Sequence, residues 1–201
     1  MRGLREIAPL LEEQGVLIIY PAPGEPVEAD VAVAPPKGSP EEALYDLSVV
    51  SASRVIYTPG FKNALFDALS GPSGRFESVI IGIDPGRDCG FSVMGDGMLL
   101  DMGKVPCNTV GPRVSGVIGV IKYKSVKVYL GDGPGFEEAA ASLSAAGVEY
   151  IVLGEEYTST HGQLHATIPR IRDKDVKAAI RIAYRGAYSG GRLAGKVPRR
   201  G

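Results

Sequence analysis

The order of apolar segments in the second half of the chain restricts the fold more than any other feature of this sequence. Residues 77–84, 89–94 and 98–104 each have strand character and follow one another directly. Gly95-Asp96-Gly97, between the second and the third, is a strong hairpin signal. Strands and helices alternate only after this point: helices are predicted at 109–123, 136–146 and 173–188, and strands at 126–130 and 148–153.

This order predicts a mixed sheet. Two hairpin connections make the first three strands antiparallel, and the two helical crossovers that follow require parallel pairing. The first strand then lies in the middle of the sheet, beside the fourth. A Rossmann-type domain alternates strands and helices from its start, so this order argues against it. We therefore predict an α/β domain over residues 77–188 with a five-stranded sheet, an antiparallel meander followed by two parallel crossovers.

The first part of the chain predicts a small α/β domain of unknown role over residues 1–69. Apolar residues at helical spacing predict a first helix that ends at Gly15, and the apolar run 16–20 predicts a buried strand. Ser39, followed by Pro40 and two acids, is typical of a helix N-terminus. The other expected elements are strands at 30–34 and 54–58 and a helix at 61–69.

Composition and termini place few further limits on the chain. Turn residues cluster in a predicted linker at 70–76, and residues 189–201 are expected to form a basic flexible tail. At 44% hydrophobic and 22% charged, the composition is that of a globular protein. No apolar run approaches the roughly 20 residues that span a bilayer, and the N-terminus is a charged amphipathic stretch rather than a signal peptide. We expect no membrane partner.

The two cysteines, Cys89 and Cys107, form neither a disulfide framework nor a zinc-ligand spacing. A reducing cytoplasm is therefore the expected location. Amide side chains are scarce, which suits a thermophile.

Charge is unevenly distributed along the chain. Residues 161–201 hold ten Lys and Arg against two Asp, a balance of +8, which leaves −9 for residues 1–160 of a chain with net charge −1. Such asymmetry indicates either a partner with phosphates near the basic end or a solvated helix face followed by a tail.

Acidic residues follow the ends of three predicted strands. Asp84 ends the first strand before Pro85-Gly86, and Asp132 comes directly after the fourth. If these strands are neighbours about 5 Å apart, the two carboxylates converge. Glu155 and Glu156 follow the fifth strand at the same edge of the sheet.

The last helix opens with Asp173 and Asp175, and it can supply a further carboxylate if it packs across the sheet. Oxygen ligands without His or Cys favour Mg²⁺ or Mn²⁺ over Zn²⁺. Two such ions could activate water and stabilise the leaving oxygen of a phosphodiester. Each acid also has a structural interpretation, as a turn residue, a solvated loop residue or a first-turn helix acid. The metal hypothesis therefore depends on their joint placement.

Three segments resemble a known family. The first is similar to the first-strand motif of RuvC-type Holliday-junction resolvases, within the RNase H-like superfamily, and the other two are similar to segments of YqgF-type resolvases. They are Ile81-Gly82-Ile83-Asp84-Pro85-Gly86, Glu155-Glu156-Tyr157-Thr158-Ser159-Thr160 and Asp175-Val176-Lys177-Ala178-Ala179-Ile180-Arg181-Ile182-Ala183.

The resemblance covers residues 77–188 and implies that Asp84, one of Glu155 and Glu156, and Asp175 bind metal. Asp132 corresponds to a position where many superfamily nucleases keep an acid. There are departures: Tyr157 stands where the family has Arg, and the last helix begins with acids two residues apart rather than three. A junction resolvase needs two active sites, so a homodimer is expected only if that resemblance holds.

Other motifs are weaker. Gly131-Asp132-Gly133-Pro134-Gly135 could cradle a phosphate but lacks the Lys-Ser/Thr of a P-loop, and a structural turn is favoured. His161 and His165 lack the Glu of a metalloprotease motif. Tyr184 and Tyr188, four apart on the last helix, are expected to pack rather than to stack on bases.

Our leading hypothesis is a Mg²⁺- or Mn²⁺-dependent nuclease that cuts structured DNA or RNA, branched DNA included. The expected catalytic residues are Asp84, Asp132, Glu156 and Asp175, with Glu155 as a further metal ligand. The alternative is a non-catalytic nucleic-acid- or protein-binding module on the same fold. A sugar-kinase-like phosphotransferase is disfavoured, because it needs two such domains.

A basic stripe is predicted on the last helix. Its members lie three or four residues apart and therefore share one face: Lys174, Lys177, Arg181 and Arg185. We expect sequence-independent contacts between this stripe and the phosphates of a nucleic acid.

Overall fold

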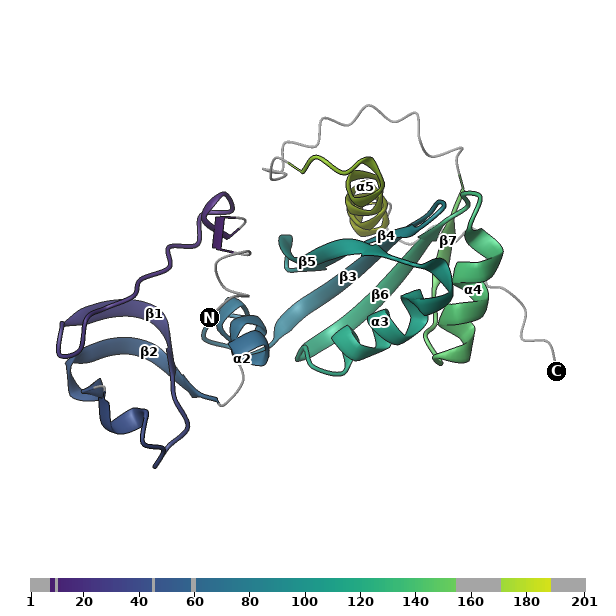
Figure 1. The fold of residues 1–201 in the computed structure, drawn as a ribbon. Coiled ribbons are helices and arrows are strands. Elements are labelled where there is room, and N and C mark those ends of the chain that lie inside the picture. Colours follow the sequence, from purple (N-terminus) through teal and green to yellow (C-terminus); the bar gives the residue numbers. More distant parts are fainter. Residues whose placement is uncertain (1–7, 10, 45, 59–60, 155–170, 189–201) are drawn as a thin grey trace. The chain divides into compact units, whose positions relative to one another are not determined.

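The chain folds into two compact units (Figure 1). The computed structural model describes residues 8–9, 11–44, 46–58, 61–154 and 171–188. Unit 1 comprises Met1–Phe76 with Val120–Lys122, and unit 2 comprises Glu77–Gly119 with Tyr123–Gly201. The expected tail 189–201 lies outside the described residues.

A mixed five-stranded sheet forms the centre of unit 2, with the strand order β5-β4-β3-β6-β7. Its strands are β3 (Phe76–Pro85), β4 (Cys89–Gly95), β5 (Met98–Val105), β6 (Tyr123–Gly131) and β7 (Ile151–Leu153). β4 is antiparallel to both β3 and β5, whereas β6 and β7 are parallel. The predicted mixed α/β sheet is therefore confirmed, with β3 at its centre beside β6.

Helix α5 (Lys174–Tyr188) covers one face of this sheet (Figure 1). Its close approach depends on glycine: a Cβ atom added at Gly82 of β3 would lie 2.1 Å from the carbonyl oxygen of Ala179. At the other end of the helix, the Tyr129 hydroxyl of β6 donates a hydrogen bond of 2.8 Å to the carbonyl oxygen of Gly186. Between these points the helix buries an apolar side that includes Ile180 and Ala183. α5 thus crosses the central strands of the sheet.

Helices α3 (Val110–Ile118) and α4 (Phe136–Ala145) cover the opposite face (Figure 1). They pack closely where Gly111 meets Ser142, whose hydroxyl accepts a hydrogen bond from the Gly111 amide and donates one to the carbonyl oxygen of Asn108. The helix predicted at 109–123 ends earlier, at Ile118, and β6 begins at Tyr123 rather than at residue 126. The helix is capped at Gly119, and the carbonyl oxygen of Lys122 accepts a hydrogen bond from the Phe76 amide at the start of β3.

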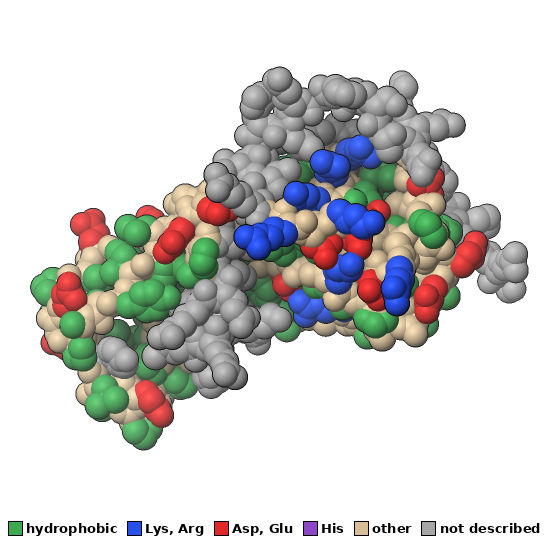
Figure 2. Space-filling model, turned by 45° about the horizontal axis from the view of Figure 1, so that its top comes forward, with side chains coloured by type: hydrophobic (Ala, Val, Ile, Leu, Met, Phe, Trp, Pro, Cys, Tyr) green, Lys and Arg blue, Asp and Glu red, His purple; other side chains and the backbone are tan. Residues whose placement is uncertain are grey.

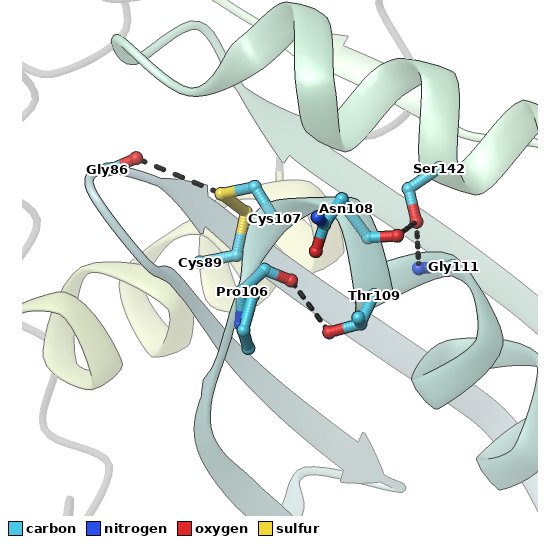
Figure 3. The surroundings of a disulfide bond; sticks show 8 residues. All are labelled: Gly86, Cys89, Pro106, Cys107, Asn108, Thr109, Gly111 and Ser142. Atoms are coloured by element: carbon cyan, nitrogen blue, oxygen red, sulfur yellow. Dashed lines mark hydrogen bonds between the residues drawn. A yellow bond between two sulfur atoms is a disulfide. The ribbon is translucent and has the colours of Figure 1, made fainter.

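The two cysteines form a disulfide, which corrects the expectation from the sequence (Figure 3). The β4–β5 hairpin places Val105 opposite Cys89, and Cys107 follows two residues later in a short 3-10 helix, η3 (Cys107–Thr109). The two Cα atoms are 4.9 Å apart, within the range that a disulfide spans. Both side chains are buried, and the bond ties the start of β4 to the chain that leads into α3.

Unit 1 contains a parallel two-stranded sheet of β1 (Val27–Ala34) and β2 (Val50–Tyr57), followed by α2 (Phe61–Leu69). The Arg54 guanidinium of β2 joins this sheet to the end of α2, since it donates hydrogen bonds of 2.9 Å to the carbonyl oxygens of Asp67 and Gly71. The helix at 61–69 is confirmed, and both strands begin earlier than expected.

Two predictions for unit 1 were wrong. Residues 16–20 form no strand, and the side chain of Leu17 is 79% exposed. The Val16 amide is already used at the end of the preceding turn, where it donates to Leu11. Ser39 accepts a hydrogen bond from the Glu42 amide as a helix cap does, but the segment continues as two 3-10 turns, η1 (Glu42–Leu44) and η2 (Leu47–Val49).

Within the described part of the chain, every helix is too short or too polar to cross a membrane.

Candidate functional site

Three residues on neighbouring strands form a row across the sheet at the carboxyl end of β3. Asp84 of β3 pairs with Gly90 of β4, and Gly90 pairs with Lys104 of β5. Side chains of directly paired residues point to the same face of a sheet. In β3 this face is the one that α5 covers, because Gly82, two residues before Asp84, contacts Ala179 of α5. Asp84 and Lys104 therefore flank a glycine on the α5 side.

The first turn of α5 lies on that glycine. A Cβ atom at Gly90 would be 2.3 Å from the carbonyl oxygen of Asp175, a distance that only a residue without a side chain permits. Gly90 thus brings the start of α5 down onto the sheet between Asp84 and Lys104. The sequence analysis expected that the last helix could pack across the sheet, and α5 does so with Asp175 in its first turn.

The neighbouring charges act on the Asp84 carboxyl. Burial raises the pKa of the Asp84 carboxyl above its ordinary value, the negative charge of Asp175 raises it further, and the nearby Lys174 ammonium acts in the opposite direction. A half-buried carboxylate next to a second one binds protons more readily than a solvated carboxylate, unless a cation compensates the charge.

Lys104 supplies positive charge at this point. Its ammonium lies 2.5 Å from Oδ2 of Asp175 and 3.6 Å from Oδ2 of Asp173. The hydrogen bond to Asp175 raises the pKa of Lys104, and the negative charges of Asp173, Asp175 and Asp88 act in the same direction. Sequence reasoning did not identify Lys104 as a site residue.

Asp173 has a different role from Asp175. Its Oδ1 accepts hydrogen bonds from the amides of Asp175, at 2.9 Å, and Val176, at 3.2 Å. These amides belong to the first turn of α5, so Asp173 caps the helix. The hydrogen bond from Val176 lowers the pKa of Asp173.

Asp132 follows β6, the strand beside β3, and its convergence with the Asp84 carboxylate stays a prediction. It is exposed, and its Oδ2 lies 3.7 Å from the position that a Cβ atom of Gly154 would take, so the side chain reaches towards the end of β7. The glycines around it pack against β3. A Cβ atom at Gly133 would lie 2.4 Å from the carbonyl oxygen of Pro85, and the Gly135 amide donates to that same oxygen. These glycines therefore have a packing role in the loop.

The remaining expected ligands, Glu155 and Glu156, lie outside the described residues, as do His161 and His165. Within the part of the chain that the structure describes, no three His, Cys, Asp or Glu side chains are grouped so that they could hold a metal ion. Asp84 and Asp175 nevertheless form a pair of oxygen donors. Mg²⁺ is commonly held by one or two carboxylates, with water and substrate phosphate as its other ligands. Two carboxylates are a number of protein ligands with which Mg²⁺ can be held.

The basic stripe lies on the solvent side of α5. Lys174, Lys177 and Arg181 are exposed and Arg185 is half-buried, while the intervening Ile180 and Ala183 face the sheet. Figure 2 shows Lys and Arg side chains gathered on one face of unit 2, with acidic side chains among them. Tyr184 is buried, as expected for a packing residue. The stripe begins next to Asp175 and runs along the helix away from it.

Together these features define an α/β domain in which Asp84, on the central strand of a mixed sheet, lies near Asp175, in the first turn of a basic helix. No protein-family model, no curated protein and no solved structure matches this chain.

Proposed function

We propose that unit 2 is an RNase H-like domain that cleaves phosphodiester bonds in structured nucleic acid with Mg²⁺ or Mn²⁺ as cofactor. The observation that carries the proposal is the pair formed by Asp84, at the end of the central strand, and Asp175, in the first turn of α5. The strand order of the sheet and the basic stripe on the same helix support it.

Each part of the site has a defined task in this proposal. Asp84 and Asp175 would hold the cation, and Asp132, Glu155 and Glu156 are candidate further ligands. The bound cation would polarise the scissile phosphate and lower the pKa of an attacking water. The basic stripe, Lys174, Lys177, Arg181 and Arg185, binds the phosphates of the nucleic-acid backbone and orients it along α5.

The test uses full-length protein with branched, duplex and single-stranded DNA and RNA, in Mn²⁺ and in chelator. Cleavage is expected in Mn²⁺ with at least one substrate. Asp84→Asn is expected to lower its rate by about a hundredfold or more, since electrostatic stabilisation of the charge that develops on a phosphate contributes strongly to catalysis. Glu137→Gln is the matched control, because Glu137 is an exposed acid on α4. Cleavage that persists undiminished in Asp84→Asn would contradict the proposal.

One observation favours the second candidate, a non-catalytic nucleic-acid-binding module. Asp175 already forms an ion pair with Lys104, so the site contains a cation of its own and has less need for a metal ion. For such a module, the same substrates are bound but remain uncut in both Mn²⁺ and chelator, and Asp84→Asn leaves the affinity unchanged.

The basic stripe leads to a prediction that both candidates share. Replacing Lys174, Lys177, Arg181 and Arg185 with alanine should reduce the slope of log affinity against log salt concentration. On duplex DNA each phosphate contact contributes about 0.9 to that slope, so the loss of four contacts lowers it by about 3.6. The control is Lys124→Ala/Lys127→Ala, on exposed positions of β6. A slope that is equal in all three proteins would show that the stripe is only a solvated helix face.

A further inference from the structure

We propose that Lys104 and a divalent cation compete for Asp175, so that Lys104 acts as a built-in cation that controls metal occupancy of the site. The proposal rests on the proposed function, because it assigns a regulator to the same pair of carboxylates. It concerns a residue on β5, one of the two edge strands of the sheet, that belongs to neither the acids nor the basic stripe.

The position of Lys104 is determined by the sheet rather than by chance proximity. Lys104 is in register with Gly90, and Gly90 is the residue on which Asp175 lies. The lysine therefore emerges directly beside the first turn of α5, and its ammonium forms the 2.5 Å bond to Oδ2 of Asp175. Asp84 stands on the other side of Gly90. Asp175 is thus the carboxylate between the Lys104 ammonium and the second member of the acidic pair.

Asp175 is also the carboxylate that can change partners. Asp173 is committed to the helix cap, whereas no backbone hydrogen bond to the Asp175 carboxylate occurs among the described residues. Lys104 has a flexible four-carbon stem and its side chain is 34% exposed, so its ammonium can move into solvent. A cation that Asp84 and Asp175 share would meet the ammonium at close range, and like charges at that distance repel. Occupation by one therefore disfavours the other.

The experiment measures Mn²⁺ binding directly, by isothermal titration calorimetry and by the loss of the free Mn²⁺ signal in electron paramagnetic resonance. The full chain is compared with Lys104→Met, Lys104→Gln, Lys104→Arg and Asp84→Asn. Removing the charge is expected to tighten Mn²⁺ binding by about tenfold, the effect of one neighbouring charge on an ionic equilibrium. Lys104→Arg keeps the charge and is expected to stay within about threefold of the natural chain.

Thermal unfolding with and without Mn²⁺ is recorded for each protein, so that a loss of folding is not read as a loss of binding. If Lys104→Met does not fold, Lys104→Gln is the neutral variant that is compared with the natural chain. Equal affinities of the natural chain and both neutral variants, with binding lost in Asp84→Asn, would overturn the role of Lys104 and leave the proposed function standing. Absence of Mn²⁺ binding in every protein, the neutral variants included, would overturn both.

Discussion

Gly82→Ala is expected to destabilise unit 2 by about 3 kcal/mol, at the upper end of the usual cost of overpacking a core. The added methyl group would lie 2.1 Å from the carbonyl oxygen of Ala179 and 2.6 Å from the amide nitrogen of Ala183. Both are backbone atoms of α5, so no side chain can rotate away to make room. The helix must lift from the sheet, and this would separate Asp175 from Asp84.

Gly116→Ala is the matched control. Gly116 lies in α3, and a Cβ atom there would meet nothing within 4 Å. Alanine has the higher helix propensity, so this variant is expected to be more stable by about 0.5–1 kcal/mol. Urea unfolding followed by circular dichroism gives both values. Equal stability of the two variants would mean that α5 does not pack on Gly82 as described.

The second large effect is expected at the disulfide. Cys89→Ala/Cys107→Ala should lower the free energy of unfolding by about 3 kcal/mol, the value that chain entropy gives for a loop of this size. The bond closes a loop with a sequence separation of 18 and is buried against the turn after β3, where Cys107 Sγ lies 3.8 Å from the carbonyl oxygen of Gly86 (Figure 3). Urea unfolding of the natural chain, with and without a strong reductant, measures the same quantity.

The reductant should bring the natural chain close to the double variant and leave the double variant unchanged. A natural chain that is insensitive to reductant, with no free thiols detected after unfolding in its presence, would show only that reduction failed. Complete reduction without a change in stability would contradict the prediction.

Much of the sheet in unit 2 was predictable because its signals are local. Gly95-Asp96-Gly97 specifies a turn between two apolar runs, and Asp96 and Gly97 both adopt positive φ there. Asp96 also accepts hydrogen bonds from the amides of Glu77 and Ser78, which joins this turn to β3. The alternation after Thr109 then leaves few ways to complete the sheet, since parallel strands need crossover connections.

Lys104 could not be predicted by counting from that turn. Gly95 pairs with Met98, and continuing this register would place Gly103 opposite Gly90. A β-bulge between Val93 and Met94 shifts the register by one residue and brings Lys104 opposite Gly90 instead. A one-residue shift moves every later side chain to the other face of the sheet. The sequence sign of this bulge is that two adjacent residues, Leu99 and Leu100, are apolar and both are buried.

The disulfide was missed for a related reason. Two cysteines separated by 18 residues form no recognisable framework when only their number and spacing are considered. Folding the predicted hairpin back on itself would have placed the chain near Cys107 beside Cys89. In unit 1, the strand predicted at 16–20 was wrong. A strand needs a partner strand as well as apolar residues, and in the described part of unit 1 β1 and β2 pair with each other.

One member of the acidic pair lies on the first strand of unit 2 and the other on its last described helix, so the two are synthesised at different times. The ribosome releases β3 to β7 before α5, and a domain can begin to fold while synthesis continues. A growing chain can therefore form the hairpins and crossovers of the sheet while Gly82 and Gly90 remain uncovered. Asp84 gains its neighbour only when α5 emerges and docks, so the order of synthesis itself delays assembly of the site until the whole sheet has been made.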